Sequence, residues 1–118
     1  MISAPTMARA AGCSYRQLDH WVRNGILVPA VGAHGSGTQR RWSAAQVPLV
    51  RLVTRLSALG APATVLRRAV ETAGDLDART FLFVTLDGTV TAPDDFAVAE
   101  GYVVDVEAIM PVQRELVA

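Results

Sequence analysis

A short stretch near the N-terminus gathers the side chains best suited to contact a polyanion. Five such residues follow one another at steps of one, three, one and three positions, so on an α-helix they would share one face. They are Tyr15, Arg16, Asp19, His20 and Arg23. Guanidinium groups bind phosphates and guanine edges, and phenol, carboxylate and imidazole groups hydrogen-bond to bases or stack on them. The pattern predicts a surface suited to the edges and phosphates of DNA.

The helix that would carry this face has clear signals in the sequence. Ser14 is a good N-cap, because its hydroxyl can accept a hydrogen bond from an otherwise unpaired backbone N–H. Residues 15–24 then hold one apolar stripe, formed by Leu18, Trp21 and Val22. A first helix over residues 6–11 and a turn containing Gly12 precede it. Together they predict a helix-turn-helix, whose second helix enters a major groove.

A β-hairpin wing is predicted to follow, with strands over residues 26–31 and 38–42 and a glycine-rich tip between them. Because side chains alternate along a strand, Arg40 and Arg41 would point to opposite faces, and we expect Arg40 to contact the DNA backbone. The glycine-rich tip also has the composition of a nucleotide-binding loop, but it lacks the lysine and the spacing of such a loop, which favours the wing over that alternative. The predicted DNA-binding residues are Ser14, Tyr15, Arg16, Asp19, His20, Arg23, Arg40 and Arg41.

Two antiparallel helices are predicted behind the wing. Ser43 and Gln46 form a capping box before the first of them, which ends at Gly60, and Pro48 is expected to cost it one backbone hydrogen bond. The second helix begins at Pro62. The predicted core positions of the pair are Leu49, Leu52, Val53, Leu56, Leu59, Val65, Leu66, Ala69 and Val70.

The formal charge of the chain is divided between two units. Residues 1–74 hold nine arginines against Asp19 and Glu71, which gives +7, whereas residues 75–118 hold two arginines against nine acidic residues, which gives −7. A basic unit indicates a polyanionic partner, and an acidic one indicates solubility, self-association or regulation. We expect the nine guanidinium groups to converge on one surface that straddles a duplex.

The acidic unit, residues 75–118, is predicted to be small and β-rich. Strands over residues 80–86 and 89–91 flank a hairpin turn at Asp87-Gly88, and a third strand covers residues 102–108. A short helix is expected from Pro93.

Three strands need an apolar face to be stable, and that face must pack somewhere. Its predicted members are Phe81, Phe83, Val104 and Val106. They could pack on the helix pair or on a second copy of the chain. Of the two, we expect a homodimer contact through residues 80–110.

Four strings of the sequence together carry a family resemblance. They are Ala11 to Leu18, Trp21 with Gly25 to Pro29, Arg40 to Ser43, and Arg55 to Gly60. With this order of elements, residues 3–73 resemble the DNA-binding domain of the MerR family of winged helix-turn-helix transcription regulators. The resemblance implies an α+β fold of four helices and a hairpin wing over residues 1–74. It also implies that Arg16 contacts DNA from the second helix and Arg40 from the wing.

The chain departs from the family pattern at several points. Asp19 stands where many members carry arginine, and His20 where an aromatic residue is usual. No heptad run for the family's long coiled-coil helix follows Gly74. The C-terminal part instead resembles that of some short actinobacterial MerR-like regulators.

The sequence therefore predicts a cytoplasmic, sequence-specific binder of double-stranded DNA that regulates transcription. A phage-type excision or directionality factor would use the same fold, and a protein-binding module or antirepressor acting through the acidic unit is the alternative of another class. No metal site is expected, since Cys13 is the single cysteine and His20 and His34 lack ligand partners. No enzyme, cofactor or membrane contact is expected either, because the sequence shows no nucleophile spaced with a base and no apolar run of about 20 residues. The sequence assigns no residue to contact with an RNA polymerase or an integrase.

Overall fold

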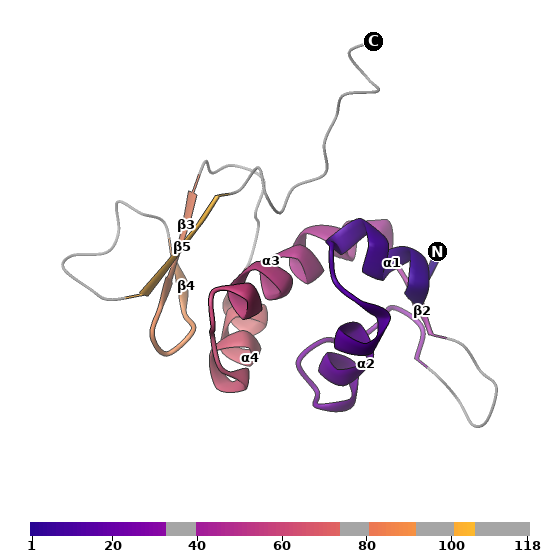
Figure 1. Ribbon diagram of the computed structural model, residues 1–118, viewed down its shortest axis with the longest axis horizontal. Coiled ribbons are helices and arrows are strands. Elements are labelled where there is room, and N and C mark those ends of the chain that lie inside the picture. Colours follow the sequence, from indigo (N-terminus) through magenta and orange to yellow (C-terminus); the bar gives the residue numbers. More distant parts are fainter. Residues whose placement is uncertain (33–39, 74–80, 92–100, 106–118) are drawn as a thin grey trace, which may run out of the picture.

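The computed structural model describes residues 1–32, 40–73, 81–91 and 101–105. Within these ranges four α-helices and one short 3-10 helix are combined with two small antiparallel sheets, which is an α+β arrangement (Figure 1). The first sheet pairs β1 (Ile2–Ser3) with β2 (Arg41–Trp42). The second sheet has the order β4 (Val90–Thr91), β3 (Phe81–Thr85) and β5 (Gly101–Asp105).

The predicted helix-turn-helix is present as α1 (Ala4–Ala11) and α2 (Tyr15–Arg23). The first helix begins two residues earlier than expected, because Ser3 caps it: its Oγ accepts a hydrogen bond from the Thr6 N–H at 3.4 Å. Gly12 ends α1 with a left-handed φ of +78°, a conformation that side chains with a Cβ rarely adopt. The chain therefore turns sharply into α2.

The predicted capping box of Ser43 and Gln46 is also present, but it starts a 3-10 turn (Ala44–Gln46). The helix α3 (Val47–Ala58) follows directly, so Pro48 lies in its first turn. Backbone N–H groups in a first turn have no acceptor within the helix. The expectation that Pro48 costs a hydrogen bond is therefore wrong.

The helix pair α3 and α4 (Ala63–Thr72) forms much of the core. Predicted core residues that are buried are Leu52, Val53, Leu56, Val65, Leu66 and Ala69, whereas Leu49 and Val70 are half-buried. Leu59 is 49% exposed, contrary to prediction, because α3 ends at Ala58 and Leu59 is its C-cap. Val50 is fully buried and was not predicted.

The second sheet packs on the helix pair. Val84, Val90 and Val104 are buried in the same core as α3 and α4, and β5 contacts α3. The backbone N–H of Val90 donates to Thr72 Oγ1 at 2.9 Å, which ties β4 to the end of α4. Val104 thus packs within its own chain. The side chains of Phe81 and Phe83, the predicted helix from Pro93 and all residues after 105 lie outside the described residues.

The predicted first strand of the wing, residues 26–31, is wrong in extent. Only Val31 pairs, in a single bridge with Arg41. The strand that pairs with β2 is β1 instead. Pro29 has no N–H to offer a strand, and the Val28 carbonyl already accepts a hydrogen bond from Gln46 Nε2 at 2.8 Å. The tip, residues 33–39 with His34, lies outside the described residues.

Candidate nucleic-acid interface

The helix α2 is fixed by a reciprocal cap at its start. Ser14 Oγ accepts from the Gln17 N–H, and Gln17 Oε1 accepts from the Ser14 N–H, both at 3.0 Å. Two otherwise unpaired donors are thereby satisfied. Ser14 was predicted as the N-cap, but the contribution of Gln17 to the cap was not predicted. A glutamine at the third helical position is the signal that could have indicated it.

The rotation of α2 about its axis is set by its apolar stripe. Leu18 is 1% exposed and Trp21 4%, so both anchor the helix on the core, and Val22 is half-buried. The opposite side is consequently turned to solvent. It carries Tyr15, Arg16, His20 and Arg23, which were all predicted for this face and are all exposed.

Asp19 lies between two arginines. Its Oδ2 accepts from Arg23 Nε at 2.7 Å, one turn further along α2, and its Oδ1 accepts from Arg40 Nη1 at 2.5 Å. The hydrogen bond from Arg40, with a smaller contribution from Arg23, lowers the pKa of Asp19 below the ordinary value of 3.8. The structure thus joins the second helix to the residue that was predicted to contact DNA from the wing.

The two arginines predicted to lie in a wing, Arg40 and Arg41, have different environments. The Arg40 side chain is 21% exposed, against 73% for Arg23. Arg41 is half-buried on β2, where its backbone pairs with Ser3 and also exchanges two hydrogen bonds of 2.9 Å with Val31. Arg40 thus lies at the edge of the α2 face, while Arg41 belongs to β2, which pairs with β1.

His20 is held at the C-terminal end of α2. The Asn24 side-chain amide nitrogen lies 3.2 Å from His20 Nδ1 and donates to the His20 carbonyl at 2.7 Å. This contact orients an exposed imidazole on the same face as Arg16 and Arg23.

The nine arginines of residues 1–74 do not converge on one surface, contrary to expectation. Arg51 Nε donates to the Ala10 carbonyl at 2.8 Å and so faces α1. Arg67 donates to the Asn24 carbonyl at 2.9 Å, whereas its neighbour Arg68 lies beside Gly88 and pairs with Glu71 at 3.6 Å. Consecutive residues of a helix point about 100° apart, so Arg67 and Arg68 lie on different sides of α4. The contacts of Arg51 and Arg67 join distant segments, so no local pattern in the sequence indicates them.

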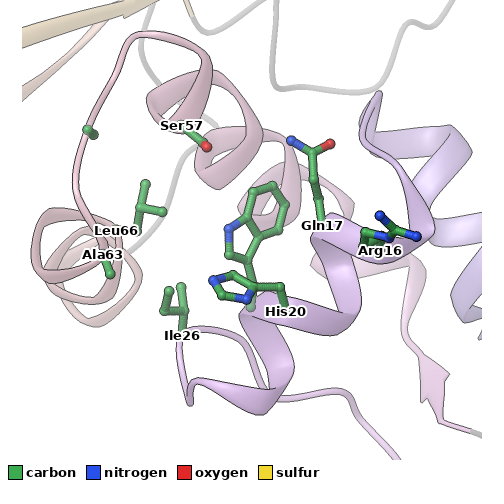
Figure 2. A pocket seen from close by; sticks show the side chains of 9 residues that line it. Arg16, Gln17, His20, Ile26, Ser57, Ala63 and Leu66 are labelled. Carbon is green, nitrogen blue, oxygen red and sulfur yellow. The ribbon is translucent and has the colours of Figure 1, made fainter.

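A cleft of about 420 Å³ separates α2 from the corner between α3 and α4 (Figure 2). Its apolar part includes Trp21, Ile26 and Leu66, and Arg16 and His20 of the exposed α2 face also line it. Sequence reasoning did not find this cleft, since its lining comes from two distant segments, residues 16–26 and residues 57–66.

Further features of the part of the chain that the structure describes bear on metal binding, membrane spanning and thiol chemistry. No group of three or more metal-ligating side chains occurs there. None of the described helices is both long and apolar enough to cross a membrane. Burial raises the pKa of the Cys13 thiol, because desolvation disfavours the thiolate.

The fold and the exposed face of α2 define a helix-turn-helix protein, and comparison with known proteins gives its family. Residues 2–72 match the family described as MerR HTH family regulatory protein. The chain therefore belongs to the MerR family. Uncharacterized HTH-type transcriptional regulators from Mycobacterium bovis and Mycobacterium tuberculosis are each 38% identical to it over 68 residues. The match covers 57% of this chain but only 30% of each relative.

Proposed function

We propose that the chain is a sequence-specific, double-stranded DNA-binding regulator of transcription of the MerR type, acting in the cytoplasm. The observation that carries the proposal is the face of α2 on which Arg16, His20 and Arg23 are exposed and Asp19 pairs with both Arg23 and Arg40. A helix of this kind fits a major groove, and four groups of that chemistry suit phosphates and base edges. The family and the names of the relatives support the same function.

The environments of the residues suggest which part of the DNA each would contact. Arg16 and Arg23 would contact phosphates or guanine edges, and Tyr15 and His20 would refine the choice of sequence. Arg40 would contact the adjacent backbone, and Ser14 and Arg41 would lie at the border of the interface. Residues 1–74 would form the DNA-binding domain and residues 75–118 an acidic dimerisation or regulatory unit.

DNA binding is tested by fluorescence anisotropy with duplexes selected from a random library by the full chain. Arg16→Ala combined with Arg40→Ala should abolish binding to the selected duplex, and each substitution alone should reduce the steepness of the salt dependence by about one phosphate contact. Arg68→Ala is the matched control, because Arg68 is paired with Glu71 beside the hairpin turn. If the double variant binds as well as the parent, the DNA-binding face is not on α2 and the protein-binding alternative is favoured.

We also propose that two copies associate through residues 80–110. One module offers few base contacts, so repeated half-sites would be needed for specificity. The strand β5 lies at an edge of its sheet, and Val103 in it is 60% exposed, which leaves an apolar position available to a second copy. Val103→Glu should shift the mass measured by analytical ultracentrifugation toward the monomer. A monomeric parent would refute this assembly without affecting the DNA-binding proposal.

A further inference from the structure

The contacts of Asp19 link two parts of the proposed interface that the sequence separates by 21 residues. Each carboxylate oxygen is used by a different guanidinium: Oδ2 by Arg23 and Oδ1 by Arg40. The Asp19 side chain is only 23% exposed. Both oxygens are therefore engaged in charge-assisted hydrogen bonds, which are stronger than neutral ones.

The backbones on both sides of this link are anchored. Asp19 follows Leu18 and precedes Trp21 by two residues, and those side chains fix α2 on the core. Arg40 precedes β2, which pairs with β1 and bridges Val31. The long arginine side chain is thus the flexible part between two fixed backbones, and the Asp19 carboxylate is what holds its far end.

The charges favour the same reading. Arg23 and Arg40 approach one carboxylate from two sides, and without it two like charges would lie close together and repel. With it, the cluster keeps one net positive charge, and the guanidinium groups still have donors that the carboxylate does not use. Those donors remain available to phosphate oxygens.

We propose that Asp19 is a positioning residue of the DNA interface, which sets the places of Arg40 and Arg23 relative to α2 instead of reading a base itself. The inference rests on the proposed function and deepens it. Preorganised contacts gain affinity because the entropy of ordering the side chains is lost before binding. Asp19 would therefore contribute to discrimination between sites although it brings a negative charge toward DNA.

The test uses the full chain with Asp19→Asn, which removes the charge and keeps the shape. Affinities are measured by anisotropy for the selected duplex and for a random-sequence duplex of equal length. We expect affinity for the selected duplex to fall about three- to tenfold, a part of what one charge-assisted contact contributes, while affinity for the random duplex is unchanged or rises. Asp19→Glu, which keeps the charge, should recover most of the ratio. In an Arg40→Ala background, Asp19→Asn should cause a smaller further loss than in the parent, because only Arg23 is then left to be positioned.

Glu71→Gln is the matched control for net charge. Glu71 pairs with Arg68 on α4 and its side chain is 57% exposed, so this variant changes the formal charge equally at a different place. It should leave the ratio of the two affinities unchanged within about twofold. Thermal unfolding of each variant, followed by circular dichroism, confirms that the comparison is made between folded proteins.

Three outcomes separate the explanations. If Asp19→Asn raises both affinities equally, Asp19 only repels phosphates and the inference is wrong. If it changes the preferred base at a single position of the duplex, Asp19 reads that base directly and the inference is again wrong. If the parent binds no duplex at all, the proposed function fails and the inference fails with it, whereas the first two outcomes leave the function intact.

Discussion

The hairpin turn at Gly88 approaches α4 more closely than a side chain would allow, and we expect Gly88→Ala to destabilise the protein strongly. Gly88 has a φ of +97°, and a Cβ placed there would lie 2.5 Å from the Val65 carbonyl oxygen and 2.6 Å from Arg68 Cβ. A left-handed conformation costs a residue with a Cβ about 1 to 2 kcal/mol. Forcing extra atoms into a packed contact costs about 1 to 3 kcal/mol more. The expected loss in free energy of unfolding is therefore about 2 to 5 kcal/mol.

The hairpin could avoid the clash by separating from α4, but the free-energy cost of that separation is no smaller. Val84, Val90 and Val104 are buried between the sheet and the helices. Fully burying a side chain of this size contributes about 1.5 to 3 kcal/mol. Separation would expose all three, so we expect the turn to shift and the packing to remain, at reduced stability.

Gly60→Ala is the matched control. Gly60 also has a positive φ, +90°, but no atom lies within 4 Å of the position its Cβ would take. Only the backbone cost of about 1 to 2 kcal/mol applies there. Urea unfolding followed by circular dichroism gives both losses, and hydrogen exchange at the Val90 N–H reports on the contact with Thr72. Equal losses in the two variants would show that the hairpin does not pack against α4 as described.

Three further predictions concern single contacts. Ser14→Ala should lower the free energy of unfolding by about 1 kcal/mol in urea denaturation, since the Gln17 N–H loses its acceptor, and Ser14→Asp should not. Thr72→Val should cost about 1 to 3 kcal/mol in the same assay, because the Val90 N–H would be left without its partner; an unchanged midpoint would contradict this. The hydroxyl of Thr85, and then the Thr89 backbone N–H, lower the pKa of Asp87 from 3.8 to about 2. A lowered pKa in the folded state stabilises it above about pH 4, so this contribution should disappear as the pH falls from 3.8 to about 2, and Asp87→Asn should remove that dependence.

Local signals made the helical part of the fold predictable. The caps at Ser14 and Ser43 act within three residues, and the burial of Leu18 and Trp21 follows from helical periodicity alone. The same signals placed Tyr15, Arg16, His20 and Arg23 on an exposed face. Where prediction failed locally, as at Pro48, the cause was an interrupted helix start: a 3-10 turn shifted the first α-helical residue by three positions.

Contacts between distant segments could not be predicted in this way. The pairing of β1 with β2, the bond from Arg67 to the Asn24 carbonyl and the approach of Gly88 to Val65 each join residues that share no local pattern. The contacts of Asp19 show the same limit. Its sequence position suggested a base contact, and only the fold brings Arg40, 21 residues away, to its carboxylate.

The pairing of β1 with β2 has a practical consequence for how the protein is handled. Ile2 lies opposite Trp42 and Ser3 opposite Arg41, so this antiparallel register carries Met1 toward Ser43, which caps the turn before α3, and away from Arg40. An affinity tag or a surface linker fused ahead of Met1 would instead strain the two-residue pairing that holds Ile2 against the core. Stability and binding are therefore better measured after such a tag has been removed.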